Sequence, residues 1–459
     1  MAHNFNPTIL REYDIRGIVG DTLTEDDAYA LGRSFAALTR GEGARTLAVG
    51  RDGRTHSGML EAALIRGLTE GGVNVVQIGM GPSPMLYFAT HYLDVDGGIQ
   101  VTGSHNPADY NGFKMLLKGR SVYGEEIQAL GRRAAAGEWS AGDGSIEEVE
   151  IREAYVDRLL QDFAGKPYRI GWDAGNGAAG PTLDMLVERL PGQHHVIHAE
   201  VDGTFPNHHP DPTVESNLAD LKALVAREQL DFGIAFDGDG DRIGAIDGRG
   251  RVIWGDQLML ILAEPVLQEQ PGATIIADVK ASQVLFDGIA RLGGQPLMWK
   301  TGHSLIKSKM KETGAPLAGE MSGHIFFKHR WYGFDDALYA AVRLIEAVSA
   351  SGKSLTEIMD AMPKSMATPE MRFQVDETRK FAIVDEVRDR LLSDGANVDA
   401  TDGVRVSTGD GWWLLRASNT QDVLVARAEA KDQAGVGRLV AQIDEQLEKS
   451  GVQRTESAH

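Results

Sequence analysis

The chain has 459 residues, enough for about three domains of the usual ~150 residues. It carries 46 Lys and Arg against 66 Asp and Glu, and the resulting formal net charge of −20 repels phosphodiester backbones and anionic membranes, which argues against a nucleic-acid-binding or membrane-surface protein. The absence of cysteine excludes disulfides, thiolate zinc sites and cysteine nucleophiles.

The sequence gives no sign of a membrane span or a secretory signal. The most apolar stretch, Leu258–Leu267, is interrupted by Glu264 and Pro265 and is much shorter than the ~20 residues that a bilayer requires. The N-terminal residues lack the basic start and apolar core of a signal peptide. We therefore expect a cytoplasmic protein, either a monomer or a small homo-oligomer.

An internal repeat organises the first three quarters of the chain. Three times, an apolar strand that ends in Asp is followed by an amphipathic helix and a second strand, which predicts three α/β units with largely parallel sheets. These elements fall at Thr46–Asp52, Met59–Glu70 and Val73–Ile78, then at Tyr168–Asp173, Pro181–Leu190 and His195–His198, and then at Ala273–Asp278, Gln283–Leu292 and Gln295–Trp299.

The residues after about Pro369 follow a different pattern. Short strands are predicted at Val404–Ser407, Gly411–Arg416 and Asp422–Arg427, before a closing helix at Ala434–Leu447. The two prolines of Met362–Pro369 favour a linker. We predict three tandem α/β domains with mixed, largely parallel sheets and a C-terminal α+β domain, arranged around a central cleft, with boundaries at 1–150, 151–252, 253–366 and 367–459.

In each of the three repeats, a further strand ends in a polar loop. The segments made of strand and loop begin at Gly98, Phe232 and Leu317, and their loops carry Ser104, Asp237 and Glu320, respectively. Open α/β sheets bind ligands beyond the carboxyl ends of their strands, so matching positions in three repeats would bring the loops to one cleft.

The second of these loops has the strongest chemical signal. Asp237, Asp239 and Asp241 alternate with glycines directly after a buried strand, and hard oxygen ligands of this kind suit Mg²⁺. An ordinary Asp/Gly turn is the alternative. An EF-hand does not fit, because Arg242 stands where that motif requires glycine.

The other loops are more ambiguous when each is considered alone. Ser104 beside His105 suggests a nucleophile, although Asn106 departs from the Gly-x-Ser-x-Gly elbow and a solvated turn remains open. The loop from Glu320 to His324 suits a polyol or, alternatively, a helix N-cap. A turn near the C-terminus combines a guanidinium, two hydroxyls and an amide, which could bind a phosphate or form a solvated hairpin tip. Its residues are Arg416, Ser418, Asn419 and Thr420.

A glycine-rich turn offers a competing hypothesis. The segment from Gly175 to Gly180 follows a strand and opens a helix, with Glu200 and Asp202 at a plausible distance for a ribose contact, as in a nicotinamide dehydrogenase. Dinucleotide binding would leave the three polar loops without a role. Most of the histidines indicate surface or packing roles, whereas His303 lies where it would face the cleft.

Together, the segment Arg11-Glu-Tyr13-Asp-Ile-Arg16-Gly and the serine, aspartate, sugar and phosphate loops resemble the α-D-phosphohexomutase family in this order over essentially the whole chain. The resemblance implies four domains around a central cleft. It also implies a phosphoserine at Ser104 and a Mg²⁺ ion held by Asp237, Asp239, Asp241 and an oxygen of that phosphoserine. Arg242 would help neutralise the phosphate, and Lys114 or His105 would take part in proton transfer.

The resemblance further implies a set of substrate contacts: Glu320 and Ser322 with His324 nearby for sugar hydroxyls, Arg416, Ser418, Asn419 and Thr420 for the non-reacting phosphate, and Tyr13, Arg16, Lys114, Lys280, Thr301, Gly302 and His303 along the cleft. The implied reaction converts hexose 1-phosphate to hexose 6-phosphate through hexose 1,6-bisphosphate. The loops resemble those of enzymes for mannose and glucose more than those of glucosamine mutases. A phosphoglucosamine mutase, an NAD-dependent dehydrogenase and a non-catalytic sugar-phosphate binding protein remain the alternatives.

Overall fold

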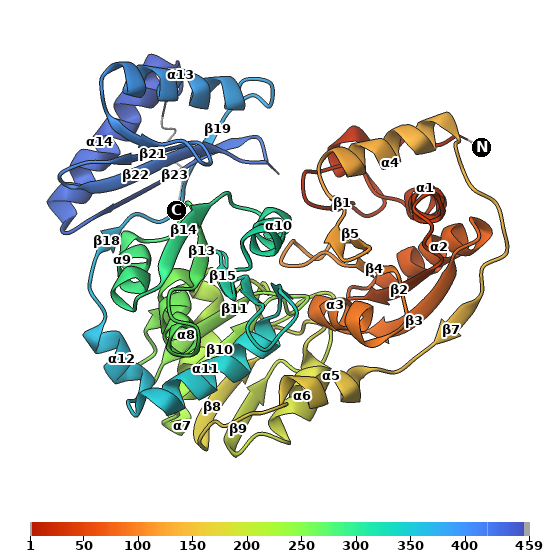
Figure 1. The fold of residues 1–459 in the computed structure, drawn as a ribbon, viewed down its shortest axis with the longest axis horizontal. Helices are drawn as coiled ribbons and strands as arrows, with labels where there is room; N and C mark the ends of the chain where they lie inside the picture. Colours follow the sequence, from red (N-terminus) through yellow and green to blue (C-terminus); the bar gives the residue numbers. More distant parts are fainter. Residues whose placement is uncertain (1, 420, 454–459) are drawn as a thin grey trace.

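Four β-sheets follow one another along the chain in the computed structural model, which describes residues 2–419 and 421–453 (Figure 1). The first three contain parallel strand pairs and are packed with helices, whereas the fourth is entirely antiparallel. Residues from all four parts line one central cavity. The expected fold of three tandem α/β domains and a C-terminal α+β domain around a cleft is therefore confirmed.

The first sheet has the strand order β1-β5-β4-β2-β3-β7, with β6 paired to β5. Because β4 runs parallel to β2, the loop that carries Ser104 leaves the sheet at the carboxyl ends of both strands. The elements are η1 (Pro7–Ile9), β1 (Ile15–Ile18), α1 (Glu25–Gly41), β2 (Thr46–Arg51), α2 (Ser57–Glu70), β3 (Asn74–Met80), α3 (Ser83–Tyr92), β4 (Gly97–Val101), β5 (Tyr110–Leu117), β6 (Arg120–Ser121), α4 (Glu125–Ala136) and β7 (Ile146–Glu148).

The second sheet has the order β12-β11-β10-β8-β9, and the aspartate loop joins β10 to its antiparallel neighbour β11. Strands β10 and β11 are buried along their whole length, which explains their continuous apolar sequence. The elements are α5 (Arg152–Leu159), β8 (Tyr168–Asp173), α6 (Gly180–Val187), β9 (Gly192–Ile197), η2 (Glu215–Leu218), α7 (Ala219–Glu228), β10 (Phe232–Phe236), β11 (Ile243–Asp247) and β12 (Val252–Ile253).

The third sheet repeats this plan with the order β14-β13-β15-β16-β17. The sugar loop predicted from the sequence joins β15 to the antiparallel β16, as the aspartate loop joins β10 to β11. The elements are α8 (Gly255–Glu269), β13 (Thr274–Asp278), α9 (Gln283–Arg291), β14 (Gln295–Trp299), α10 (His303–Thr313), β15 (Leu317–Gly319), β16 (Ile325–Phe327), β17 (Phe334–Asp335), α11 (Ala337–Ser351) and α12 (Leu355–Ala361).

The fourth sheet has the order β18-β23-β22-β21-β20, with β19 also paired to β23. Its first strand, β18, lies inside the stretch expected to be a linker and pairs with β23 through Met366 and Ala367. The connection is therefore attached to the sheet that follows it. The elements are β18 (Met366–Ala367), β19 (Met371–Gln374), α13 (Lys380–Ser393), β20 (Asn397–Asp399), β21 (Val404–Ser407), β22 (Gly411–Ala417), β23 (Val423–Ala430) and α14 (Gln433–Lys449).

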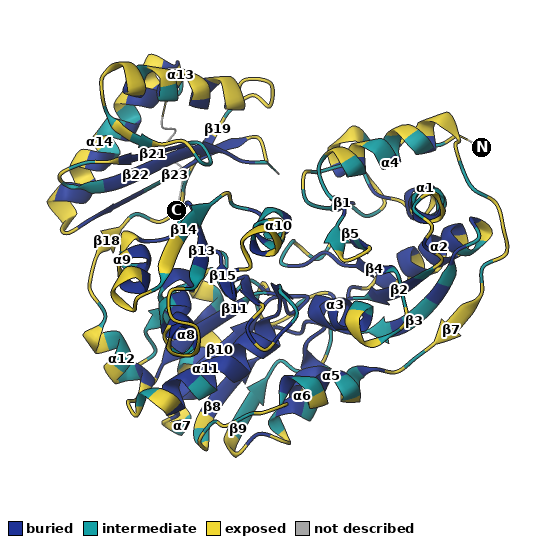
Figure 2. Ribbon diagram, viewed as in Figure 1, coloured by how far each residue is buried: buried dark blue, intermediate teal, exposed yellow. Residues whose placement is uncertain are grey.

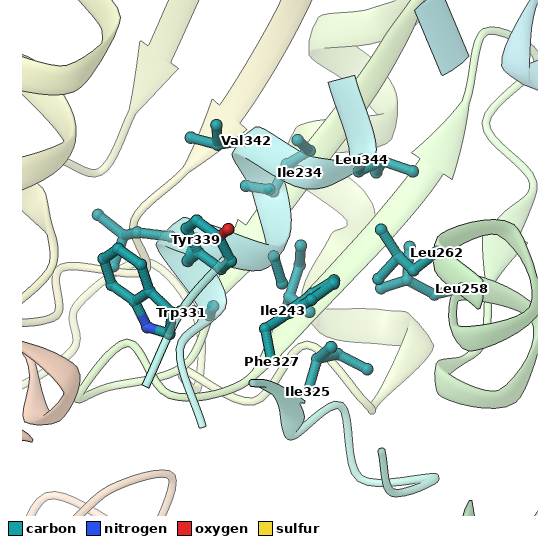
Figure 3. Close-up of a cluster of buried hydrophobic side chains, with 14 of the residues drawn as sticks. Ile234, Ile243, Leu258, Leu262, Ile325, Phe327, Trp331, Tyr339, Val342 and Leu344 are labelled. Carbon is teal, nitrogen blue, oxygen red and sulfur yellow. The ribbon is translucent and has the colours of Figure 1, made fainter. Parts of the chain in front are cut away.

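The second and third units share one hydrophobic core, which the repeat pattern did not predict. In Figure 3, Ile234 and Ile243 of the second sheet lie in the same cluster as Leu258 of α8, Phe327 of β16 and Leu344 of α11. Helix α11 is buried nearly all round, so it lies between layers rather than on a surface. The first and fourth units each have an apolar cluster of their own, although α3 of the first unit packs into the shared core.

The burial pattern matches this arrangement. Figure 2 shows buried strands in the central sheets, whereas α4, α13 and α14 expose one face along the outside of the molecule. Among residues 2–419 and 421–453, no helix combines the length and the apolar composition needed to cross a membrane.

The N-cap of α11 makes the stability depend on pH. Asp336 is 1 % exposed and accepts hydrogen bonds from Tyr339 N at 2.9 Å and from the Tyr155 hydroxyl at 2.8 Å. Burial raises the pKa of Asp336 from 3.8 to about 7. The folded state therefore binds this proton more tightly than the unfolded chain does, and the contribution to the free energy of unfolding falls as pH rises from about 4 to about 7.

We expect Asp336→Asn, a neutral cap that can bond to both partners, to raise the melting temperature relative to the wild type by several degrees more at pH 8 than at pH 5. Thermal unfolding at the two pH values measures this difference. The matched control is Asp432→Asn, which changes the exposed N-cap of α14. An effect of Asp336→Asn that is equal at both pH values would contradict the prediction.

Candidate active site

The predicted site residues gather around one cavity of about 1560 Å³ between the four sheets. The predicted residues that line it are Tyr13, Arg16, Ser104, His105, Lys114, Arg242, Lys280, Thr301, Gly302, His303, Glu320, Ser322, His324, Arg416, Ser418 and Asn419. Asp237, Asp239 and Asp241 lie fully buried next to it. Thr420 lies outside the described residues.

Ser104 lies at the cavity wall in an unusual backbone conformation. Its φ of +49° is in the left-handed region, and its side chain is turned toward the second unit. Ser104 Oγ donates a hydrogen bond to Asp237 Oδ2 at 3.0 Å and lies 3.2 Å from His105 Nδ1. Residues 133 positions apart in the sequence thus bring a hydroxyl into direct contact with the carboxylate cluster.

Arg54 holds this serine loop from beneath, a role that the sequence analysis missed. Its buried guanidinium donates hydrogen bonds to the carbonyl oxygens of Ser104 at 2.7 Å and Asn106 at 2.6 Å, and also to those of Pro107 and Tyr110. A Cβ at Gly103 would lie 2.1 Å from Arg54 Nε, so only glycine permits this approach. The planar fork of arginine suits four carbonyls that converge from one loop.

We expect Arg54→Lys to lower kcat by roughly 10–100-fold with a smaller effect on KM, because the charge remains but the loop loses the donors that fix Ser104. Steady-state kinetics measure the separate effects on kcat and KM, and circular dichroism checks that the fold is kept. The matched control is Arg66→Lys on the exposed face of α2. A kcat within twofold of the wild type would show that the serine loop does not need Arg54.

Three buried carboxylates form the chemical centre of the site. Ligand atoms of Asp237, Asp239 and Asp241 lie within 4.8 Å of one another, and all three residues are 0 % exposed. Burial, followed by repulsion from the two neighbouring carboxylates, raises the pKa of Asp237. Asp239 Oδ1 is buried and has no hydrogen-bond partner among the described residues, which leaves it available as a ligand. This arrangement can bind a divalent metal ion.

Lys114 balances part of this negative charge. Its ammonium group is 5 % exposed and donates to Asp239 Oδ2 at 2.7 Å and to Asp241 Oδ2. Burial acts to lower the pKa of Lys114, but the two aspartates outweigh burial and raise it well above its usual value. Lys114 therefore remains positively charged.

The sugar loop is joined to the aspartate loop through His324. Glu320 accepts a hydrogen bond from Gly302 N at 2.6 Å and bonds to His324 Nδ1 at 2.8 Å, while His324 Nε2 lies 3.3 Å from Asp241 Oδ1. Burial acts to lower the pKa of His324, but the charge of Asp241 and hydrogen bonds to Asp241 and Glu320 raise it to about 9. His324 is thus a cation between two carboxylates, and Ser322 Oγ lies 3.1 Å from its Nδ1.

At the predicted phosphate-binding end of the cavity, the hydroxyl of Tyr13 connects the first, third and fourth units. Tyr13 OH accepts a hydrogen bond from Asn419 Nδ2 at 2.6 Å and donates to the Thr301 carbonyl at 2.8 Å. Asp402, which the sequence analysis missed, accepts hydrogen bonds from Arg416 Nε and from Thr301 N, each at 3.0 Å. These contacts hold Arg416 at the cavity, with its side chain 7 % exposed.

The aspartates that end the first strand of each repeat position the polar loops. Asp52 Oδ2 accepts a hydrogen bond from Gly103 N at 2.9 Å, and Asp278 Oδ1 accepts one from Met321 N at 3.2 Å. In the second unit, the corresponding Asp173 contacts His208 instead, at 2.9 Å. The repeat in the sequence predicted the turns that carry these aspartates, but it did not predict a role for the aspartates themselves.

The glycine-rich turn has a packing role. Ala178 N donates to the Gly238 carbonyl at 3.0 Å, and a Cβ on Gly180 would lie 1.9 Å from the Ala199 carbonyl oxygen. Residues 174–180 are all buried. A Cβ on Gly177 would lie 2.8 Å from the Gly238 carbonyl oxygen, so these glycines allow the turn to pack closely against the aspartate loop and the segment after β9. A turn that is buried in this way is closed to a pyrophosphate, which argues against the dinucleotide hypothesis.

Comparison with protein-family models matches four successive parts of the chain to the phosphoglucomutase/phosphomannomutase family: α/β/α domain I at residues 7–140, domain II at 153–250, domain III at 254–366 and the C-terminal domain at 370–446.

Curated relatives and solved structures are similar over nearly the whole chain. Phosphomannomutase/phosphoglucomutase of Pseudomonas aeruginosa is 47% identical over 442 residues, which cover 96% of this chain and 95% of that protein. A phosphoglucomutase of Neisseria gonorrhoeae is 45% identical over 436 residues, covering 94% and 95%. The crystal structure of a phosphoglucomutase/phosphomannomutase family protein from Burkholderia thailandensis superposes with a TM-score of 0.93 at 42% identity, covering 97% and 98% of the two chains.

Proposed function

The chain belongs to the phosphoglucomutase/phosphomannomutase family, and from this premise we propose that it interconverts the 1-phosphates and 6-phosphates of mannose and glucose through a phosphoserine at Ser104. The observation that carries the proposal is the 3.0 Å contact between Ser104 Oγ and Asp237 Oδ2 at the wall of a cavity lined by all four units. A hydroxyl next to three carboxylates fits a phosphoryl carrier beside a metal site.

The residues present fit Mg²⁺, because this ion prefers oxygen ligands and usually keeps several water molecules beside the carboxylates that bind it. Asp237, Asp239 and Asp241 would hold the ion together with an oxygen of the phosphoserine, and within the described part of the chain Asp239 Oδ1 has no competing hydrogen bond. When bound, the ion supplies positive charge to the transferring phosphoryl group.

The reaction needs no nucleotide. The bond from phosphorus to Ser104 Oγ breaks as a bond forms between phosphorus and the free hydroxyl of a hexose 1-phosphate, which loses its proton, while Ser104 Oγ gains one. The products are hexose 1,6-bisphosphate and free Ser104. After the bisphosphate reorients in the cavity, the bond between O1 and its phosphorus breaks as that phosphorus bonds to Ser104 Oγ. Ser104 Oγ loses its proton, O1 gains one, and hexose 6-phosphate leaves.

The electrostatics favour His105 over Lys114 for proton transfer at the serine. Burial, followed by the positive charges of Arg242 and Arg16, lowers the pKa of His105 well below its usual value, so its imidazole is neutral 3.2 Å from Ser104 Oγ. Lys114 keeps its proton and would act as a fixed charge. Arg16 and Arg242 would stabilise the phosphoryl group during transfer.

The remaining residues would bind the two ends of the substrate. Glu320, Ser322 and His324 present groups suited to sugar hydroxyls, while Arg416, Ser418 and Asn419, together with Thr420 outside the described residues, would bind the non-reacting phosphate. Tyr13, Lys280, Thr301, Gly302 and His303 complete the wall between these ends. The predicted domain boundaries, the cytoplasmic location and the monomeric or small homo-oligomeric state remain predictions.

The direct test is a ³¹P NMR time course with Mg²⁺ and trace hexose 1,6-bisphosphate, using the 1-phosphates of glucose, mannose and glucosamine in separate reactions. We expect the first two to be converted to 6-phosphates, with little turnover of the third. Turnover of glucosamine 1-phosphate alone would identify a phosphoglucosamine mutase. No turnover of any substrate would contradict the proposal.

A further inference from the structure

Strands β8 and β9 are labelled in Figure 1. Where they end, a second group of side chains that could bind a metal lies outside the active site. Asp173 is the last residue of β8, His198 follows β9, and His208 comes from the loop beyond it. One ligand atom of each lies within 4.8 Å of the others. None of the three is among the described residues that line the cavity.

Each of these side chains is oriented by a partner on its outer side. His198 Nε2 donates to Asp220 Oδ2 at 3.0 Å, His208 Nδ1 donates to the His209 carbonyl at 3.0 Å, and Asp173 Oδ1 accepts from Gly175 N at 2.9 Å. Histidines that bind metals almost always donate their other N–H to a carboxylate or a backbone carbonyl. Both histidines here have such a partner.

These hydrogen bonds leave one potential ligand atom on each of the three side chains. With its proton on Nε2, His198 has a lone pair on Nδ1, which has no hydrogen-bond partner within residues 2–419 and 421–453. With its proton on Nδ1, His208 has a lone pair on Nε2, which faces the carboxylate oxygen Asp173 Oδ2 across 2.9 Å. Two acceptor atoms at this distance require a cation between them, either a proton or a metal ion.

We propose that Asp173 Oδ2, His198 Nδ1 and His208 Nε2 form a site for a divalent transition-metal ion of the zinc class. Two imidazoles and one carboxylate favour such ions over Mg²⁺, which prefers oxygen ligands alone. A tetrahedral ion holding two ligand atoms at about 2.0–2.1 Å keeps them about 3.3 Å apart. The pair at 2.9 Å reaches that spacing with a shift of a few tenths of an ångström. One coordination position remains for water.

The bound ion would attach the loop after His208, which reaches the active site, to the second sheet. His208 is followed directly by His209, Asp211 and Thr213, which line the cavity, whereas Asp173 and His198 are anchored at the ends of two paired strands. The ion would therefore fix the cavity wall to the second sheet without touching the substrate. From the sequence, these histidines were expected to have surface or packing roles, and the fold adds Asp173 as a third potential ligand beside them.

The test uses the full chain in excess Mg²⁺, which keeps the acidic cluster of the active site occupied. Titration with Co²⁺ should give one equivalent of binding with the strong visible absorption of a tetrahedral cobalt site, and Zn²⁺ should displace it. Asp220→Asn, a change at an exposed side chain that orients His198, should weaken binding by at least about 10-fold. His198→Gln should abolish it and leave the mutase activity in Mg²⁺ unchanged.

Two control variants locate the ion. His195→Gln, within β9, should bind Co²⁺ like the wild type, and so should Asp239→Asn, which alters the acidic cluster. Wild-type affinity in both His198→Gln and Asp220→Asn, loss of binding in Asp239→Asn, or no tetrahedral cobalt spectrum in the wild type would each overturn the proposal. In the last case the cation between His208 and Asp173 is a proton.

Discussion

Replacement of Ser104 by alanine is expected to lower kcat by roughly 10³-fold or more, because the variant has no oxygen to carry the phosphoryl group. The ³¹P time course with glucose 1-phosphate measures the loss. Mass spectrometry of the wild type should detect one phosphoryl group, and peptide mapping should locate it on Ser104. The variant should lack it.

The same variant separates a mutase from a non-catalytic binding protein. Calorimetric titration with glucose 1-phosphate should show that Ser104→Ala still binds the sugar phosphate, because the proposed phosphate and sugar contacts are intact. Ser407→Ala, at an exposed position of β21, is the matched control and should retain full activity. Full activity in Ser104→Ala would refute the phosphoserine mechanism, whatever the binding result.

Replacement of Lys114 by methionine is expected to destabilise the protein by about 3–5 kcal/mol when no metal is present, because it leaves Asp239 and Asp241 buried without their cation. Thermal unfolding should show the melting temperature fall by several degrees. Saturating Mg²⁺ should recover more stability in the variant than in the wild type, since the ion would replace part of the lost positive charge. Turnover should fall as well.

Lys118→Met provides the matched control, because this lysine is exposed just after the same strand. It should change neither the melting temperature nor the response to Mg²⁺ appreciably. If Lys114→Met were as stable as Lys118→Met without metal, the three aspartates would not carry the buried negative charge that the proposed metal site requires.

The sequence predicted those parts of the molecule that depend on local pattern. The helix expected at Gln283–Leu292 is found at Gln283–Arg291, because its apolar period and the glycines after it define it locally. Ser104 and Asp237 were expected in one cleft because the repeat places both after the strand of their unit that carries the polar loop. Their 3.0 Å contact agrees with that reasoning.

The missed features depend on contacts between distant segments. Arg54 and Asp402 give no local signal, since their partners are carbonyls, amides and a guanidinium that only the folded chain brings together. The shared core did leave a trace in the sequence. The segment Ala337–Ser351 is apolar nearly all round, which is typical of a helix enclosed by other layers.

That shared core bears on how the chain can be divided. A cut after Ile253 would separate β10 and β11 from α8 and α11 and leave both fragments with large uncovered apolar faces. A cut near residue 367 would pass between segments whose apolar clusters are largely their own, whereas a cut near residue 150 would also separate α3 from the shared core. The second and third units are therefore two copies of one repeat that depend on each other for folding, and α3 of the first unit covers part of the core that they share.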